Sequence, residues 1–402
     1  MKLRPADFGV ERIGTVAIAA AALVSVAVVA AIVAPTFRQA GQHQHATAAG
    51  GGARRTRVVY LAADKVRWDY APQGRNLITG QRFDGQANVF VRSGPGRIGR
   101  VYVKAQYRAY TDASFTTRTP IPARWRHLGI LGPVIHAEVG DTVKVVFKNN
   151  LDRPASVHAH GVLYAKDSEG APYQDGTGGA DKADDAVAPG KTHTYTWQVP
   201  ERAGPGPMDP SSIMWMYHSH VDEVRDTASG LQGPIVVTRR GMARTDGTPK
   251  DVDRELVAQF QVTNENDSWY LDESFGQFAS GTMPSEGDPD FEDFQESNLM
   301  HGINGYVFGN LPGLELTTGQ RVRWYLMGMG SEVDDLHTPH WHGNAVVVTG
   351  MRTDVSSLLP ATMQVADMVA DAPGSWLFHC HVNDHILAGM QARYHVATNQ
   401  QP

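Results

Sequence analysis

The chain repeats itself, and this repeat limits the folds that it can adopt more than any other feature. Residues 157–161 (Val-His-Ala-His-Gly) match residues 339–343 (Pro-His-Trp-His-Gly). Residues 215–221 (Trp-Met-Tyr-His-Ser-His-Val) match residues 376–382 (Trp-Leu-Phe-His-Cys-His-Val). The 157–161 motif and its match each lie a short distance after a Gly-containing turn and an alternating strand pattern. The sequence therefore predicts two copies of one β-sandwich.

Short strand patterns run through both copies, and no long amphipathic helical period competes with them. They are rich in β-branched and aromatic residues and are bounded by Gly, Pro, Asn or Asp. We expect an all-β chain with two Greek-key β-sandwich domains at 58–240 and 254–398, joined by a polar linker at 241–253. The acid-rich residues 286–296 are expected to form a solvated loop, with the collection of cations near the active site as the alternative. The strand patterns lie at 57–62, 100–107, 142–148, 192–199, 233–238, 255–262, 321–326 and 344–348.

The N-terminal region predicts an exported protein. The basic leader at 1–12 precedes an apolar run at 13–34, which is long enough to cross a bilayer as a helix. We expect a single-pass anchor in the cell membrane, followed by a flexible spacer at 35–57. A signal sequence cleaved near 46–48 (Ala-Thr-Ala) is the alternative, and the protein is then secreted.

Cys380, the only cysteine, is crowded by potential metal ligands. His379 and His381 flank it, and His385 and Met390 follow five and ten positions later. A thiolate, two imidazoles and a long axial Met form the site that blue copper prefers, if the second imidazole comes from elsewhere in the chain. A small buried cysteine among satisfied polar residues is the alternative. Three histidines and a Met around one Cys favour a copper site.

The histidine pairs separate two kinds of site. In an extended strand, residues i and i+2 point to the same face, so each His-X-His presents two imidazoles side by side. Eight imidazoles suit three copper ions that leave positions open for a ligand. These pairs persist in both copies: His158/His160, His218/His220, His340/His342 and His379/His381.

The blue-copper set, in contrast, is absent from the first copy. Cys380 is matched by Ser219, and the other three members also lack a metal-ligand counterpart. In this alignment His337 faces Ala155, His385 faces Val224 and Met390 faces Leu231.

The constellation resembles the multicopper oxidase family over nearly all of residues 58–398. It looks like the two-domain, small laccase-like type, and its halves are similar to the cupredoxin-like domains of ceruloplasmin and hephaestin. The resemblance implies that one-electron oxidation of a small reductant is coupled to reduction of O2 to water. Besides the His and Cys motifs, it rests on residues 128–133, 217–222, 230–234, 268–272 and 324–332.

The resemblance implies four copper ions per chain and a ligand for every position of the family pattern. The type 1 copper, where the electron enters, takes His337, Cys380, His385 and axial Met390. The type 2 copper takes His158 and His340, and the type 3 pair takes His160, His218, His220, His342, His379 and His381. Two-domain relatives close a ring of three chains, so a homotrimer with clusters between chains is expected.

Carboxylates suggest further roles. Glu332, Asp334 and Asp335 precede His337, and Asp384 precedes His385, so these acids either hold Fe²⁺ for oxidation or form a solvated rim. Asp222 either relays protons to the oxygen site or orients a ligand imidazole. Asp184 and Asp185 lie in a Gly-rich acidic stretch that resembles a Ca²⁺ site of ceruloplasmin-like domains, with a plain acidic turn as the alternative.

Other classes of function are less consistent with the sequence. The formal net charge of −6 gives no basic surface for nucleic acid. A copper nitrite reductase keeps its type 1 site in the first domain, where this chain has Ser219. A non-enzymatic copper or electron-transfer protein has no need for eight further histidines. The natural reductant, a phenol, an aromatic amine, Fe²⁺, Cu⁺ or Mn²⁺, stays open.

Overall fold

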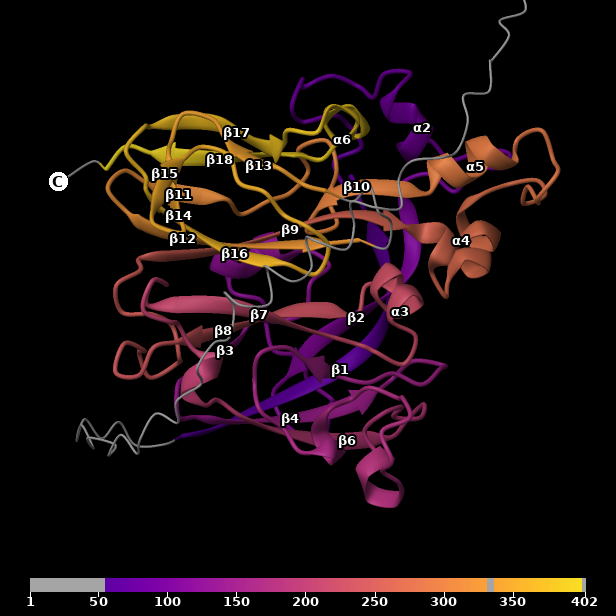
Figure 1. The fold of residues 1–402 in the computed structure, drawn as a ribbon. Coiled ribbons are helices and arrows are strands. Elements are labelled where there is room, and N and C mark those ends of the chain that lie inside the picture. The colour runs from indigo at the N-terminus through magenta and orange to yellow at the C-terminus, as the bar shows by residue number, and fades with distance from the viewer. Residues whose placement is uncertain (1–54, 331–335, 400–402) are drawn as a thin grey trace, which may run out of the picture. The chain divides into compact units, whose positions relative to one another are not determined.

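The computed structural model describes residues 55–330 and 336–399. Each half of this part is built from two sheets, as the repeat predicts. The sheet orders are β2-β1-β4-β6 and β3-β8-β7-β5 in the first half, and β10-β9-β12-β16-β14-β15 and β11-β18-β17-β13 in the second. Figure 1 shows the first-half strands in indigo to magenta and the second-half strands in orange to yellow.

The strands of the two halves correspond in order and direction. In both halves the first strand pairs in parallel with a later one, β1 with β4 and β9 with β12. The first-half strands are β1 (Thr56–Asp69), β2 (Val101–Tyr110), β3 (Ile135–Glu138), β4 (Thr142–Asn149), β5 (His158–Ala159), β6 (Thr192–Gln198), β7 (Ser212–His218) and β8 (Gln232–Thr238). The second-half strands are β9 (Arg254–Asn264), β10 (Leu299–Ile303), β11 (Glu315–Thr317), β12 (Arg321–Met329), β13 (Pro339–Trp341), β14 (Val346–Val348), β15 (Met351–Thr353), β16 (Met363–Val369), β17 (Gly374–Cys380) and β18 (Gln391–Ala397).

Each half has its own core, because alternate side chains of the strands point inward. In β4, Val143, Val145 and Phe147 are buried while Lys144 is exposed. The first core joins residues of both first-half sheets, and the second joins both second-half sheets around Trp324, Trp341 and Phe378. All eight predicted strand patterns are confirmed.

The helices are short and lie between strands. Two of them position site residues: α3 (Glu223–Ser229) follows β7, and α6 (Asn383–Ala388) follows β17. The prediction of a loop at 286–296 is partly wrong, because α5 forms there and buries Phe294. The others are α2 (Ala87–Val91), α4 (Leu271–Phe278), α5 (Phe291–Ser297) and the 3₁₀ turns η1 (Ala123–Leu128), η2 (Lys166–Ser168), η3 (Gly179–Lys182), η4 (Glu201–Ala203) and η5 (Glu265–Asp267).

The two halves pack against each other through an apolar cluster. Met214 and Met216 of β7 meet Tyr325 and Met327 of β12 in this cluster. A buried arginine adds polar contacts, because Nη1 of Arg323 donates to the Ser211 and Ser212 hydroxyl groups at 2.7 and 2.8 Å.

The predicted leader at 1–12 and membrane segment at 13–34 lie outside the described residues, as does nearly all of the spacer at 35–57. No helix within the described part is long and apolar enough to span a bilayer.

Candidate copper centres

The predicted blue-copper residues lie together in the second half. Nδ1 of His385 is 3.5 Å from Sγ of Cys380, and the ring centroids of His337 and His385 are 5.1 Å apart. The three ligand atoms of these residues lie within 4.8 Å of one another. Met390 is fully buried and follows α6, where its N–H donates to the His385 carbonyl at 2.9 Å. The chain thus brings His337, Cys380 and His385 together in a buried pocket, and Met390 belongs to the same buried cluster as Cys380.

The pocket favours a thiolate. Burial alone would raise the pKa of the Cys380 thiol, but hydrogen bonds from His337 and His385 and from the Thr338 N–H lower it to about 6. The Thr338 N–H reaches the sulfur at 3.3 Å. Because the thiolate is the form that binds metal, this environment fits a copper ligand.

The first two histidine pairs form one cluster, which we call the first quartet: His158, His160, His218 and His220. Pairing of β5 with β7 sets His158 opposite His218. Nε2 of His160 lies 3.1 Å from Nε2 of His218. Burial lowers the pKa of His160 and of His218 to about 4, so both imidazoles are neutral near pH 7, as metal ligands must be.

The second quartet, His340, His342, His379 and His381, repeats this geometry. Pairing of β13 with β17 sets His340 opposite His379, and Nε2 of His342 lies 3.1 Å from Nε2 of His379. Burial lowers the pKa of His342 and His379. His342 and His381 are exposed, so this quartet lies at a surface of the chain.

Backbone carbonyls orient two histidines in each quartet. Nδ1 of His158 is 2.7 Å from the Glu169 carbonyl, and Nδ1 of His218 is 3.1 Å from the Ser219 carbonyl. Because a carbonyl only accepts, Nδ1 carries the hydrogen and Nε2 presents its lone pair, the arrangement typical of metal-bound histidine. His340 and His379 make the equivalent contacts with the carbonyls of Asp354 and Cys380, at 2.9 and 2.6 Å. The donor set therefore fits copper.

A glycine after each first His-X-His pair fits against the tryptophan of the next motif. Gly161 and Gly343 both have φ +74°, and a Cβ there would lie 2.2 Å from the Trp215 ring and 2.3 Å from the Trp376 ring. Any larger residue would collide with the indole. The repeated Gly and Trp thus fix how the two His-X-His strands of each quartet meet.

In the first half, the position that corresponds to the blue-copper pocket keeps the same hydrogen bonds. The Ser156 N–H donates to the Ser219 hydroxyl at 3.1 Å, as the Thr338 N–H does to Cys380. The Ser219 N–H donates to the Leu231 carbonyl at 3.1 Å, as the Cys380 N–H does to Met390. These contacts confirm Ser219 and Leu231 as counterparts of Cys380 and Met390.

The predicted match of His385 with Val224 is wrong. The Leu231 N–H donates to the Asp226 carbonyl at 3.0 Å, as the Met390 N–H does to His385. Asp226 is therefore the counterpart of His385, and its carboxylate accepts from the Ser219 hydroxyl at 2.6 Å. The reason is that α3 is longer than α6 before the shared glycine cap, Gly230 or Gly389.

Two residues near the clusters, Glu223 and His301, were not predicted from the sequence, and a third, Asp222, was predicted but makes other contacts. Glu223 lies 3.2 Å from Nε2 of His220, an i,i+3 contact that the spacing alone would have allowed. Asp222 is the N-cap of α3 and accepts from the Arg225 N–H, without a direct contact to the first quartet among its described contacts. The buried His301 of β10 has its ring centroid 5.3 Å from that of His385, and no motif marks it.

The other predicted acids differ in their surroundings. Asp384 is exposed in the first turn of α6, beside His385. Glu332, Asp334 and Asp335 lie outside the described residues. Asp184 is fully buried, accepts from the Gly170 N–H at 2.7 Å, and has Oδ1 without a hydrogen-bond partner. Asp185 pairs with Lys182 at 3.1 Å.

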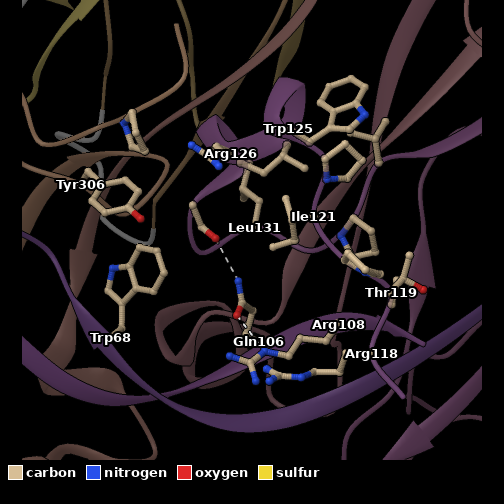
Figure 2. A pocket seen from close by; sticks show the side chains of 18 residues that line it. Trp68, Gln106, Arg108, Arg118, Thr119, Ile121, Trp125, Arg126, Leu131 and Tyr306 are labelled. Carbon is tan, nitrogen blue, oxygen red and sulfur yellow. Dashed lines mark hydrogen bonds between the residues drawn. The ribbon is translucent and has the colours of Figure 1, made fainter. Parts of the chain in front are cut away.

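A cavity of about 770 Å³ lies elsewhere in this part of the chain and is lined by none of the predicted ligands. Figure 2 shows aromatic side chains of Trp68, Trp125 and Tyr306 around it, with Arg108 and Arg118 at one end. Nothing in this lining connects it with the metal-ligand side chains.

Comparison with known proteins agrees with this geometry. Two family models, both described as multicopper oxidase, match residues 127–242 and 280–400. Human hephaestin is 47% identical over 345 residues, which are 85% of this chain and 29% of the relative. Human "Ferroxidase HEPHL1" is 46% identical over 344 residues, with the same coverage, and human ceruloplasmin is 43% identical over 349 residues, 86% of this chain and 31% of the relative. The chain thus spans less than a third of these relatives.

Solved structures support the fold. A blue copper oxidase from Nitrosomonas europaea has a TM-score of 0.54 and 18% identity, over 86% of this chain and 87% of that one. A copper nitrite reductase from the same organism has a TM-score of 0.53 and 17% identity, over 86% and 95%. Both likenesses show a shared cupredoxin-like fold. The family models and the relatives show that the chain belongs to the multicopper oxidase family, which implies that it binds copper.

Proposed function

We propose that this chain is an oxidase that couples one-electron oxidation of a small reductant to four-electron reduction of O2 to water. One observation carries the proposal. The end of β17 holds Cys380 of the blue-copper pocket between His379 and His381 of the second quartet. An electron that enters at Cys380 has a path of only a few covalent bonds to either histidine.

The ligand roles follow from which residues share a pocket. His337, Cys380, His385 and Met390 would hold the type 1 copper. Copper, when bound, supplies one-electron redox chemistry at this site and O2 reduction at the histidine cluster. The protein keeps the type 1 ligands buried, and burial lowers the pKa of His160 and His218 to about 4, so these two cluster histidines are neutral near pH 7. His158 and His340 would hold type 2 copper, and His160, His218, His220, His342, His379 and His381 the type 3 pair, for four ions per chain.

We infer that the oxygen site forms between chains, in a homotrimer. Within the described residues, no ring contact or hydrogen bond joins a histidine of the first quartet to one of the second. Each quartet is half of the eight-histidine set and is partly exposed. A head-to-tail interface that closes after three chains would bring a first quartet against a second quartet of the neighbour.

We propose Fe²⁺ as the reductant, with a phenol or aromatic amine as the alternative. A relative of this chain supports Fe²⁺, since it carries ferroxidase in its name. Exposed Asp384 beside His385 offers a carboxylate oxygen, a ligand type that suits Fe²⁺. Glu332, Asp334 and Asp335 are the other predicted iron ligands.

Three further proposals concern the surroundings. Asp222, or Glu223 at 3.2 Å from His220, supplies protons for O2 reduction. Asp184 and Asp185 hold Ca²⁺, and the buried partnerless Oδ1 of Asp184 supports a cation there. The cupredoxin-like domains span 58–240 and 254–398 and are exported behind the 13–34 anchor or, after cleavage, secreted.

The test measures O2 consumption by the copper-loaded chain with Fe²⁺ and with p-phenylenediamine. We expect activity with both, and four copper ions per chain rather than the two of a nitrite reductase. Asp384→Ala and Glu332→Ala are expected to raise KM for Fe²⁺ by about 3- to 10-fold, because a nearby opposite charge is removed. Equal loss with both reductants would remove the iron site, and copper without O2 consumption would favour an electron carrier.

A further inference from the structure

The first-half pocket that corresponds to the blue-copper pocket is organised by one buried carboxylate. Asp226 is 1% exposed. Its Oδ2 accepts from the Ser219 hydroxyl at 2.6 Å and from the Asp222 N–H at 3.2 Å, and its Oδ1 accepts from the indole N–H of Trp269 at 2.9 Å. Three converging donors are what a buried carboxylate needs to offset the loss of water.

Ser219 connects this carboxylate to the first quartet. It lies between His218 and His220, and its hydroxyl also accepts from the Ser156 N–H at 3.1 Å. The Ser156 hydroxyl in turn accepts from the His220 N–H at 3.0 Å. The backbone on both sides of Ser219 is thereby fixed relative to Asp226.

The second half keeps one of these contacts and changes another. The Thr338 hydroxyl accepts from the His381 N–H at 3.1 Å, as the Ser156 hydroxyl does from His220, whereas Cys380 lies 3.5 Å from Nδ1 of His385. There a copper ion would join Cys380 to His385. In the first half, a direct hydrogen bond joins their counterparts, Ser219 and Asp226.

We propose that Asp226 holds the strand end of the first quartet from the place where the second half would hold the type 1 copper. Asp226 is a positioning residue. It fixes the end of the His-Ser-His strand, and this places the imidazoles of His218 and His220 where they can bind the copper ions of the cluster. This inference rests on the proposed role of those histidines as copper ligands.

A second-half segment completes the arrangement. The indole N–H of Trp269 donates to Asp226, and the backbone N–H of Trp269 donates to the Ser229 hydroxyl at 3.0 Å. Nζ of Lys104 donates to the Ala228 carbonyl at 2.6 Å and to Glu265 at 2.5 Å. The α3 helix that carries Asp226 is therefore fixed from both halves of the chain.

Asp226→Asn tests the carboxylate with almost no change of shape. An amide has one acceptor oxygen, so its NH₂ group must face either the indole N–H of Trp269 or the backbone N–H of Asp222. Ser219→Ala removes the connection from the other end and keeps Asp226 and Trp269. Asp253→Asn is the matched control, because Asp253 pairs with Arg321 at 2.8 Å on the surface of the second half.

The experiment uses the full chain and follows copper per chain during titration with a chelator, the blue absorption of the type 1 centre and the electron paramagnetic resonance of the cluster. We expect Asp226→Asn and Ser219→Ala to hold cluster copper about 10- to 100-fold more weakly, as for other partners of metal ligands. The blue absorption of these two variants should match that of the wild type. Asp253→Asn should match the wild type in both blue absorption and retention of cluster copper.

The outcomes separate the two proposals. Cluster copper held with wild-type affinity in both variants would overturn the role of Asp226, as would equal loss of the blue centre and the cluster. If Asp226→Asn does not fold, Ser219→Ala decides. Failure of the wild type itself to bind copper at the quartets would overturn the proposed function instead.

Discussion

The pocket around Cys380 and the pocket around Ser219 share a backbone frame and differ in what fills it. In the second half, a thiolate, two imidazoles and a thioether converge in a dry space. In the first half, Ala155, Ser219, Asp226 and Leu231 occupy the same places, and hydrogen bonds join the polar pair. The comparison shows that the fold alone determines the backbone hydrogen bonds of the pocket, whereas four side chains determine whether the pocket can bind a metal ion.

Cys380→Ser gives the largest expected effect, because it makes the second pocket resemble the first. We expect loss of the blue absorption and of oxidase activity down to the level of copper-free protein, since serine does not provide the thiolate ligand. The two quartets should keep their copper, which metal analysis will measure. Retained oxidation of Fe²⁺ by this variant would contradict the separation of the two kinds of site.

Complementation between chains tests whether the two quartets belong to one site. His218→Ala and His379→Ala are each expected to abolish activity as homotrimers. When the two variants are refolded together, an interface is intact if the His379→Ala chain supplies its first quartet and the His218→Ala chain supplies its second quartet. With random mixing, about a quarter of the interfaces meet both conditions. Activity should return to that fraction of the wild-type value. A cluster formed within one chain predicts no recovery, and that result would reject the trimer.

Lys104→Met examines the polar packing that holds the first-half pocket. Lys104 and Glu265 are 1% and 0% exposed, so the variant leaves a buried carboxylate without its partner. We expect a loss of about 3 to 5 kcal/mol in the free energy of unfolding. Lys65→Met is the control, because the Lys65–Glu273 pair is partly exposed and contributes less than about 1 kcal/mol. Urea unfolding measures both, and equal losses would count against this account.

The smallest expected effect concerns the contact between the halves. His127 of η1 is buried, and its Nε2 accepts from the Val257 N–H at 3.0 Å. Burial, with a contribution from Arg254, lowers the pKa of His127 from 6.5 to about 3. Between these values the unfolded chain binds the extra proton, so stability is full above pH 6.5 and falls as the pH decreases.

Comparison with His127→Gln isolates this contribution. Between pH 7 and pH 5, the wild type should lose about 2 kcal/mol more than the variant, which does not titrate at this position. Unfolding by urea at the two pH values measures the difference. Parallel losses in both proteins would show that other groups, chiefly carboxylates, account for the pH dependence.

Much of the fold and of the candidate site could be predicted from sequence because its signals are local. Alternating strands and His-X-His pairs are short patterns with a direct geometric meaning. Asp226 was missed because the stretch from Ser219 to Gly230 is two residues longer than the stretch from Cys380 to Gly389, with one of the extra residues in α3 and one before it. The alignment by sequence places the gap after Val224 instead of before Asp226. His301 was missed since it reaches His385 from a distant strand, and α5 because one buried Phe294 outweighs its acidic neighbours.

The hydrogen-bond frame around Ser219 has a consequence for the order of events in maturation. This frame forms in the first half without any metal ligand set, so its backbone does not need an ion as a template. The matching frame around Cys380 can then close in the same way before copper arrives. We therefore expect metal loading to be a late step, open to control by copper supply after the chain has folded.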